Sequence, residues 1–265
     1  MPAPIDDPVL EVEHLSAAYR NEGVLDRLDL RVECGDRLGI VGESASGKTT
    51  LATALVDGVP SPGRVSGTVT HHPESGDPIA VFDLGEGDRD RFRRESITAV
   101  SGDVGRLDPT ATVDELFEPR LRAVGADEER AADLLAAVGL DHERVRYARP
   151  GELNAGGRQI ARAVRGLLTD PAVLVLDGLP LAIDHLGSAN RIDALAAAAT
   201  GVRDRTADTT VVALGSDLPS IAAVSDRLAV LYDGRVVEQG PTERVVEDPH
   251  HPHTRTLVDY YGNAL

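Results

Sequence analysis

The feature that most constrains this chain is a glycine-rich segment, GESASGKTT, at residues 42–50. It follows the short apolar run RLGIV, which is typical of a buried strand, and it precedes LATALV, which has a helical pattern. The segment fits G-x-x-x-x-G-K-[ST] in full, in the strand–loop–helix order that this motif requires. The glycines let the backbone curl so that N–H groups point at phosphate oxygens. The segment therefore predicts a nucleotide-phosphate site in an α/β protein.

Within this loop, Lys48 is expected to reach the β- and γ-phosphates, and the Thr49 hydroxyl is expected to hold Mg²⁺. The alternative, a glycine-rich turn with no ligand, leaves unexplained why Lys48 is the only lysine of the chain. The expected nucleotide-binding residues of the loop are Gly42, Glu43, Ser44, Ala45, Ser46, Gly47, Lys48, Thr49 and Thr50.

A second polar position follows an apolar run farther along the chain. Residues 173–176 read VLVL, which is typical of a buried strand, and Asp177 comes directly after them. An aspartate after a strand means little alone, but together with a complete phosphate loop it is the expected magnesium partner of Thr49. In an ATPase the next residue is usually a carboxylate that activates water, whereas here it is Gly178. The sequence therefore favours ATP and Mg²⁺ as cofactors and raises the question of whether the chain hydrolyses ATP.

Strand-like and helix-like segments alternate along the chain, which predicts an α/β core. Strands are expected at 9–15, 24–33, 37–41, 79–84, 97–100, 173–176, 211–214 and, around an Asp-Gly turn, within 227–240. Helices are expected at 51–56, 112–124, 128–140, 157–171, 188–199 and 220–226. Residues 58–67 carry too much Gly and Pro for a regular element and are expected to form a loop. The segment after residue 241 is short and largely polar.

The charge balance narrows the possible partners. There are 44 acidic residues against 27 basic ones, which gives a formal net charge of −17. A surface this acidic repels nucleic acid and anionic lipid, so no nucleic-acid partner is expected. The sequence holds no apolar run of the length that spans a membrane, and its first residues lack a secretory pattern. Cys34 is the single cysteine, which excludes an intrachain disulfide. These observations predict a cytoplasmic location.

The composition has a second unusual aspect. Apart from Lys48 the basic residues are all arginines, and aromatic residues make up 3% of the chain. An acidic composition poor in lysine and aromatics resembles the cytosolic proteins of salt-loving microbes, in which dense carboxylates keep the surface hydrated. A GC-rich genome is the alternative explanation. It accounts for the arginines but not for the excess of acid, so salt adaptation is favoured.

With the residues around them, these motifs resemble an ATP-binding cassette (ABC) subunit over nearly the whole chain. Residues 151–184 align without gaps to the signature helix, the magnesium strand and the following loop of that family. Residues 233–257 resemble importers of the oligopeptide, dipeptide and nickel group, whose subunits end in Pro-x-His-Pro-Tyr-Thr. The matching residues are Pro249, His251, Pro252, His253 and Thr254, with His253 in place of tyrosine. Three histidines in four residues leave a metal site as the less favoured reading. The resemblance also assigns Tyr19 to adenine stacking, with an ordinary strand-end tyrosine as the alternative.

The resemblance implies a P-loop NTPase (RecA-like) core with an N-terminal antiparallel β subdomain and an inserted α-helical subdomain. Residues 1–265 would form a single nucleotide-binding domain. Its core would span about 1–100 and 157–240, its helical subdomain 101–156 and its C-terminal tail 241–265.

The same resemblance shows where this chain departs from the family. The signature Leu-Ser-Gly-Gly-Gln, which caps the ATP of the partner subunit, is replaced by Leu153, Asn154, Ala155, Gly156 and Gly157. Asn154 is a favourable helix N-cap. The methyl group of Ala155 lies where backbone must approach closely, so a weakened cap is expected.

Three positions that serve hydrolysis in the family are also replaced. The glutamine that contacts magnesium and the attacking water falls on Ser101, or on Gly102 after a one-residue shift. Gly178 stands in place of the glutamate, and Ser216 in place of the histidine that contacts the γ-phosphate. A general base contributes about 10²- to 10⁴-fold to a rate. The chain is therefore expected to bind Mg-ATP and to hydrolyse it poorly at its own phosphate loop.

Taken together, the resemblance implies an ATP-binding subunit of an importer for peptides or a similar small polar solute. Its partners would be a complete cassette subunit in a head-to-tail heterodimer, transmembrane permease subunits and, indirectly, a solute-binding protein. It would lie on the inner face of the cell membrane. A regulatory or assembly subunit and a non-transport relative of the carbon–phosphorus lyase type remain alternatives. A P-loop kinase is disfavoured, because residues 153–157 retain the remnant of a signature helix.

Overall fold

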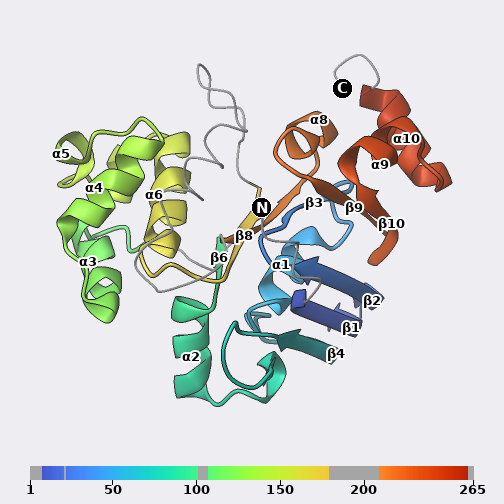
Figure 1. Cartoon of the computed structure of the whole chain (residues 1–265), viewed down its shortest axis with the longest axis horizontal. Helices are drawn as coiled ribbons and strands as arrows, with labels where there is room; N and C mark the ends of the chain where they lie inside the picture. The colour runs from blue at the N-terminus through green and yellow to red at the C-terminus, as the bar shows by residue number, and fades with distance from the viewer. Residues whose placement is uncertain (1–7, 21, 101–106, 179–208, 262–265) are drawn as a thin grey trace.

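The computed structural model describes residues 8–20, 22–100, 107–178 and 209–261 (Figure 1). These ranges contain a mostly parallel sheet, an antiparallel sheet and a group of helices. The helix expected at 188–199 lies outside the described residues. None of the helices within these ranges is long and apolar enough to cross a membrane.

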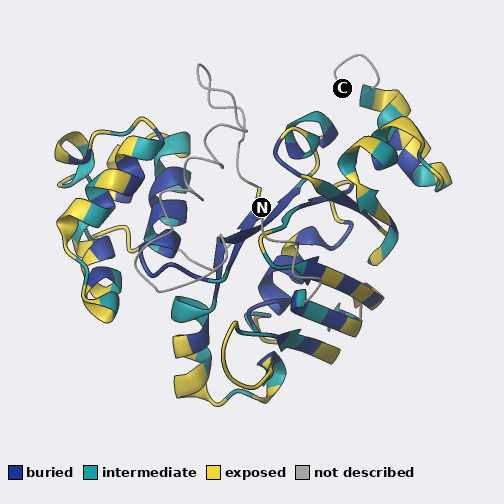
Figure 2. Cartoon of the chain, in the orientation of Figure 1, coloured by how far each residue is buried: buried dark blue, intermediate teal, exposed yellow. Residues whose placement is uncertain are grey.

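The larger sheet has six strands in the order β10-β9-β3-β8-β7-β6. Their bounds are β3 Arg37–Val41, β6 Ile97–Val100, β7 Val173–Asp177, β8 Thr210–Gly215, β9 Arg227–Tyr232 and β10 Arg235–Pro241. All pairings are parallel except that of β10 with β9. The central strands are buried and mostly apolar because helices and the second sheet cover both faces, as Figure 2 shows by their dark colour. The strands expected in this sheet are thereby confirmed.

The second sheet is antiparallel, with four strands in the order β2-β1-β4-β5. They are β1 Pro8–Tyr19, β2 Glu22–Glu33, β4 Gly63–His71 and β5 Ile79–Ala80. The loop expected at 58–67 was wrong in its second half, because β4 begins at Gly63 and pairs with β1 across a register shift. The strand expected at 79–84 was also too long, since a 3₁₀ turn at Val81–Asp83 replaces its end.

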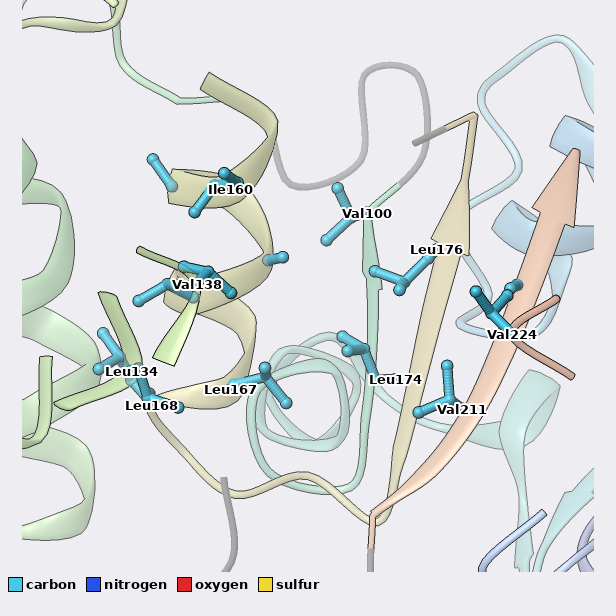
Figure 3. Close-up of a cluster of buried hydrophobic side chains, with 14 of the residues drawn as sticks. Val100, Leu134, Val138, Ile160, Leu167, Leu168, Leu174, Leu176, Val211 and Val224 are labelled. Carbon is cyan, nitrogen blue, oxygen red and sulfur yellow. The ribbon is translucent and has the colours of Figure 1, made fainter. Parts of the chain in front are cut away.

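The helices fall into two groups along the chain. The first comprises α1 Lys48–Ala54 and α2 Glu86–Glu95, followed by α3 Val113–Val124, α4 Glu128–Ala137, α5 His142–Val145 and α6 Ala155–Leu167. The helices expected at 112–124 and 128–140 are confirmed, although α4 ends at Ala137. Apolar side chains of α6 meet one face of the larger sheet, where Leu167 points toward Leu174 of β7, and Leu134 of α4 packs on the other side of α6 beside Leu168 (Figure 3). This packing fixes α6 beside β6 and β7.

The second group comprises α8 Leu218–Ala222, which lies between β8 and β9 in the chain, and α9 Thr242–Glu247 and α10 Pro252–Tyr261, which follow β10. The polar tail therefore contains two helices that were not predicted. Glu238 of β10 anchors them: its carboxylate accepts the N–H groups of His250 and His251, each at 2.9 Å, and pairs with the Arg244 guanidinium. The His253 ring stacks on Tyr232 with centroids 3.9 Å apart. Among the described residues, no three His, Cys, Asp or Glu side chains are grouped as metal ligands.

The Glu238 carboxylate is 8% exposed. Burial by itself would raise its pKa, but the N–H donors of His250 and His251 and the Arg244 guanidinium outweigh burial and lower the pKa from 4.5 to about 2. A folded-state pKa below the unfolded value means that the ionised carboxylate stabilises the fold. That contribution is complete above pH 4.5 and is lost as the pH falls to about 2.

We expect Glu238→Gln to loosen the tail, because it removes a charged acceptor from three donors at once. The free energy of unfolding at pH 7 should fall by about 2 kcal/mol, and the amides of α10 should exchange faster with deuterium. The difference from wild type should shrink between pH 4.5 and 2, where Glu238 itself becomes protonated. Glu247→Gln, at an exposed site of α9, is the matched control and should leave exchange unchanged. Equal exchange of α10 in all three proteins would contradict the anchoring role.

Candidate nucleotide-binding site

The predicted phosphate loop lies at the edge of the larger sheet where its parallel strands end. Strands β3, β8 and β7 are neighbours, so the residues that follow them converge there (Figure 1). A pocket of about 460 Å³ opens at this edge. It is lined by Val24, Ser44, Ala45, Gly47, Lys48, Thr49, Thr50, Asp177, Gly178, Gly215 and Ser216. The loop and three residues predicted from separate parts of the sequence, Asp177, Gly178 and Ser216, thus share one pocket.

The glycines of the loop are required by close approach and by backbone conformation. A Cβ atom on Gly42 would lie 2.2 Å from the carbonyl oxygen of Leu231 and 2.7 Å from Ser46 Oγ. Gly47 has a φ angle of 107°, which side chains of L-residues rarely adopt. Glycine at these two positions lets the backbone of the loop curl, as the motif requires for its N–H groups to point at phosphate oxygens.

Lys48 holds the loop from inside. Its Nζ donates to the carbonyl oxygens of Gly42 and Glu43, each at 2.8 Å, and to Ser46 Oγ at 3.3 Å. The side chain is buried, and burial lowers the pKa of its ammonium group, while the nearby charge of Asp177 opposes that shift. Because the ammonium group is bound by neutral carbonyl and hydroxyl oxygens, a charged phosphate oxygen would be a stronger partner at the same place.

Gly178 and Ser216, two of the positions at which the sequence analysis expects a replacement, line the pocket. Gly178 has a φ angle of 70°, its N–H donates to the Leu214 carbonyl at 3.0 Å, and a Cβ there would meet nothing within 4 Å. Ser216 is exposed and follows β8 directly. Among the lining residues Asp177 is the one carboxylate. Ser101, the third replaced position, lies outside the described residues, as does Gly102.

Other predicted residues lie away from the pocket. Tyr19 ends β1 and packs against Gly63, where an added Cβ would lie 2.9 Å from the tyrosine Cε1, and it does not line the pocket. The side chain of Glu43 is exposed, and only its carbonyl contributes to the loop. Asn154 caps α6 as its residue type predicts: its Oδ1 accepts the Gly157 N–H at 2.7 Å. The remnant signature, residues 153–157, therefore starts α6 and does not line the pocket of its own chain.

Sequence reasoning missed two contacts that shape the site. Gln159 of α6 donates through Nε2 to the Gly178 carbonyl at 3.1 Å and so ties the signature helix to the pocket. Gly234, in the turn between β9 and β10, donates its N–H to the Ser46 carbonyl at 3.2 Å. The Asp-Gly turn was predicted, but neither contact has a signal in the sequence, because both depend on how distant elements pack.

The fold and the pocket define a P-loop nucleotide-binding protein. A cassette solved as a dimer in a post-hydrolysis state with ADP and phosphate shares the fold, with a TM-score of 0.71 and 22% identity over 88% of this chain and 98% of that one. The family described as ABC transporter matches residues 25–179. The chain belongs to the ABC transporter family.

Relatives named for peptide transport are similar over almost the whole chain. The oligopeptide transport ATP-binding protein OppD of Mycobacterium tuberculosis is 32% identical over 95% of this chain and 41% of the relative. The dipeptide transport ATP-binding protein DppD of Caldanaerobacter subterraneus is 30% identical over 95% of this chain and 78% of the relative. The chain thus spans about two fifths of the length of the mycobacterial protein.

Gly42→Ala should destabilise the loop, because the new methyl group cannot avoid the Leu231 carbonyl without moving backbone. The free energy of unfolding in urea should fall by about 1–3 kcal/mol. Gly87→Ala is the matched control, since a Cβ there meets nothing within 4 Å in α2. It should be neutral or slightly stabilising. Equal stability of the two variants would show that the close approach at Gly42 is not restrictive.

Proposed function

We propose that this chain is the ATP-binding subunit of an ABC importer for peptides or a similar small polar solute. It binds Mg-ATP through its P-loop and hydrolyses it poorly at that site. The observation that carries the proposal is the composition of one pocket, which joins Lys48, Thr49 and Asp177 with Gly178 and Ser216. The groups that bind a nucleotide are kept, and the side chains that would act on it are replaced.

The binding half of the proposal rests on the chemistry of the pocket. Lys48 supplies a buried cation, and the curled loop supplies backbone N–H groups for phosphate oxygens. The Thr49 hydroxyl and the Asp177 carboxylate offer hard oxygen ligands, which Mg²⁺ prefers. We propose that Tyr19 stacks on the adenine. Because Tyr19 does not line the pocket, the bound base would extend beyond it toward the end of β1.

The hydrolytic half rests on what the replaced positions lack. Turnover needs a base that takes a proton from the attacking water, and Gly178 has no side chain to serve as one. Ser216 offers a neutral hydroxyl where the family resemblance implies a histidine. Among the described lining residues, Asp177 is the one carboxylate, and we assign it to magnesium. We therefore expect little ATP hydrolysis at this P-loop.

The family and the relatives named for peptide transport support a proposal for the partners. We propose a head-to-tail heterodimer with a catalytically complete cassette subunit, docked on transmembrane permease subunits at the inner face of the membrane and served indirectly by a solute-binding protein. Asn154 and Ala155 are exposed at the start of α6, so the remnant signature is accessible to the ATP of a second chain. The relatives are named for transport of oligopeptides and dipeptides, which supports a peptide as the solute.

The purified chain should bind a fluorescent ATP analogue and release phosphate near background. Lys48→Met should weaken that binding at least about tenfold, because the buried cation is lost. Robust phosphate release that disappears in Lys48→Met would contradict the proposal.

Co-expression with a complete cassette subunit and its permease tests the pairing. Transport-coupled hydrolysis that requires both subunits supports it, whereas unchanged activity of the partner favours a regulatory subunit.

Gly178→Glu alone should not restore hydrolysis. The new carboxylate has room, but a φ angle of 70° costs a non-glycine residue about 1–2 kcal/mol, so the side chain is poorly positioned. Ser216 also stays without the histidine. Gly178→Ala is the control for the backbone strain, and both variants should lose similar stability in thermal unfolding. A rise in phosphate release of more than about tenfold in Gly178→Glu would overturn this expectation.

A further inference from the structure

Helix α10 ends beside the nucleotide pocket. Its last residue, Tyr261, donates its hydroxyl to the Ser216 carbonyl at 3.2 Å. Ser216 lines the pocket and comes directly after β8. A helix of the tail is thereby joined to a pocket residue that lies 45 positions earlier in the chain.

The strand end that Tyr261 holds is also bonded to the phosphate loop. The N–H group of Gly42, the first residue of the loop, donates to the Gly215 carbonyl at 3.4 Å. Gly215 and Ser216 are consecutive, so one carbonyl accepts from the phosphate loop and the next accepts from α10. A displacement of this segment would therefore move the start of the loop as well.

The start of α10 reaches the phosphate loop by a second route. The His253 ring stacks on the Tyr232 ring with centroids 3.9 Å apart. Two residues after Tyr232, the N–H group of Gly234 donates to the Ser46 carbonyl of the loop at 3.2 Å. Each end of α10 thus contacts a segment that is itself hydrogen-bonded to the phosphate loop.

Packing against α8 keeps α10 in this place (Figure 1). Leu257 of α10 is buried in the apolar cluster that includes Leu218 and Ile221 of α8. Burial and the negative charge of Asp217 raise the pKa of the Tyr261 phenol. The hydroxyl therefore keeps its proton at neutral pH and can donate it to the carbonyl.

We propose that Tyr261 is a positioning residue of the nucleotide pocket. By holding the Ser216 carbonyl it keeps the end of β8 in place beside the phosphate loop, and it couples nucleotide binding to the docking of α10. This inference rests on the proposed function, in which the pocket binds Mg-ATP. A site that is ordered before its ligand arrives binds more tightly, because less ordering remains to be done. The coupling is reciprocal, so a bound nucleotide also holds α10 more firmly.

Tyr261→Phe tests this role, because it removes the hydroxyl and keeps the ring. The variant should bind a fluorescent ATP analogue with Mg²⁺ about threefold more weakly, as the loss of one hydrogen bond predicts. Without nucleotide, the amides of Gly42 and of the end of β8 should exchange faster with deuterium than in the wild type. Tyr260→Phe makes the same change at the neighbouring tyrosine, whose side chain is exposed, and should leave both measurements unchanged.

The reciprocal measurement separates positioning from a purely structural role. Mg-ATP should slow the exchange of the α10 amides in the wild type and in Tyr260→Phe, and it should slow them less in Tyr261→Phe. Unchanged affinity together with unchanged exchange at Gly42 would overturn the inference. A lower melting temperature with full protection of α10 by Mg-ATP would also overturn it, since the hydrogen bond would then only stabilise the fold.

Lys48→Met separates this inference from the proposed function. Binding that is lost in Lys48→Met but equal in Tyr261→Phe and the wild type would support the proposed function and contradict the role of Tyr261 in affinity. A wild-type chain that does not bind the analogue would contradict the proposed function. The exchange of Gly42 and of the end of β8 without nucleotide would then still decide whether Tyr261 positions this strand end.

Discussion

The nucleotide pocket depends on the parallel register of three central strands. Val41 of β3 pairs with Gly215 of β8, and Leu214 of β8 pairs with Asp177 of β7. The three strands therefore end at the same level, and the residues after them meet although more than half of the chain separates them in sequence. A register slip of one residue would turn Asp177 to the other face of the sheet and dismantle the site.

The same geometry explains how side chains at the strand ends can change without harm to the fold. Gly178 and Ser216 follow the strand ends, where side chains face solvent and take no part in the core. Lys48, in contrast, bonds to the loop that surrounds it and is part of the local structure. Lys48 is thus tied to the stability of this pocket, whereas the side chains at positions 178 and 216 are not. A substitution at either of these two positions is compatible with the packing of the core.

Local patterns predicted the phosphate loop, the buried strands and the helices α3 and α4, because each carries its own periodicity or motif. β4 escaped prediction since its strand conformation comes from pairing with β1, which is distant in sequence. The tail helices α9 and α10 were missed because Glu238, on another element, anchors them. The cleft lined by Arg89, Arg93, Arg120, Arg162 and Arg165 could not be predicted for the same reason. These arginines lie on α2, α3 and α6, and only packing brings them together. The hydrogen bond from Gln159 to the Gly178 carbonyl could not be predicted either, because it also depends on how distant elements pack.

The chain carries a single lysine, and it lies buried inside the phosphate loop. No other side chain offers a primary amine, so acylating reagents and amine-directed cross-linkers find no competing side-chain target on the surface. Covalent labelling of Lys48 therefore reports on the state of one pocket. Protection from such a reagent measures how much of the protein holds a ligand there, without a fluorescent analogue or an assay of turnover.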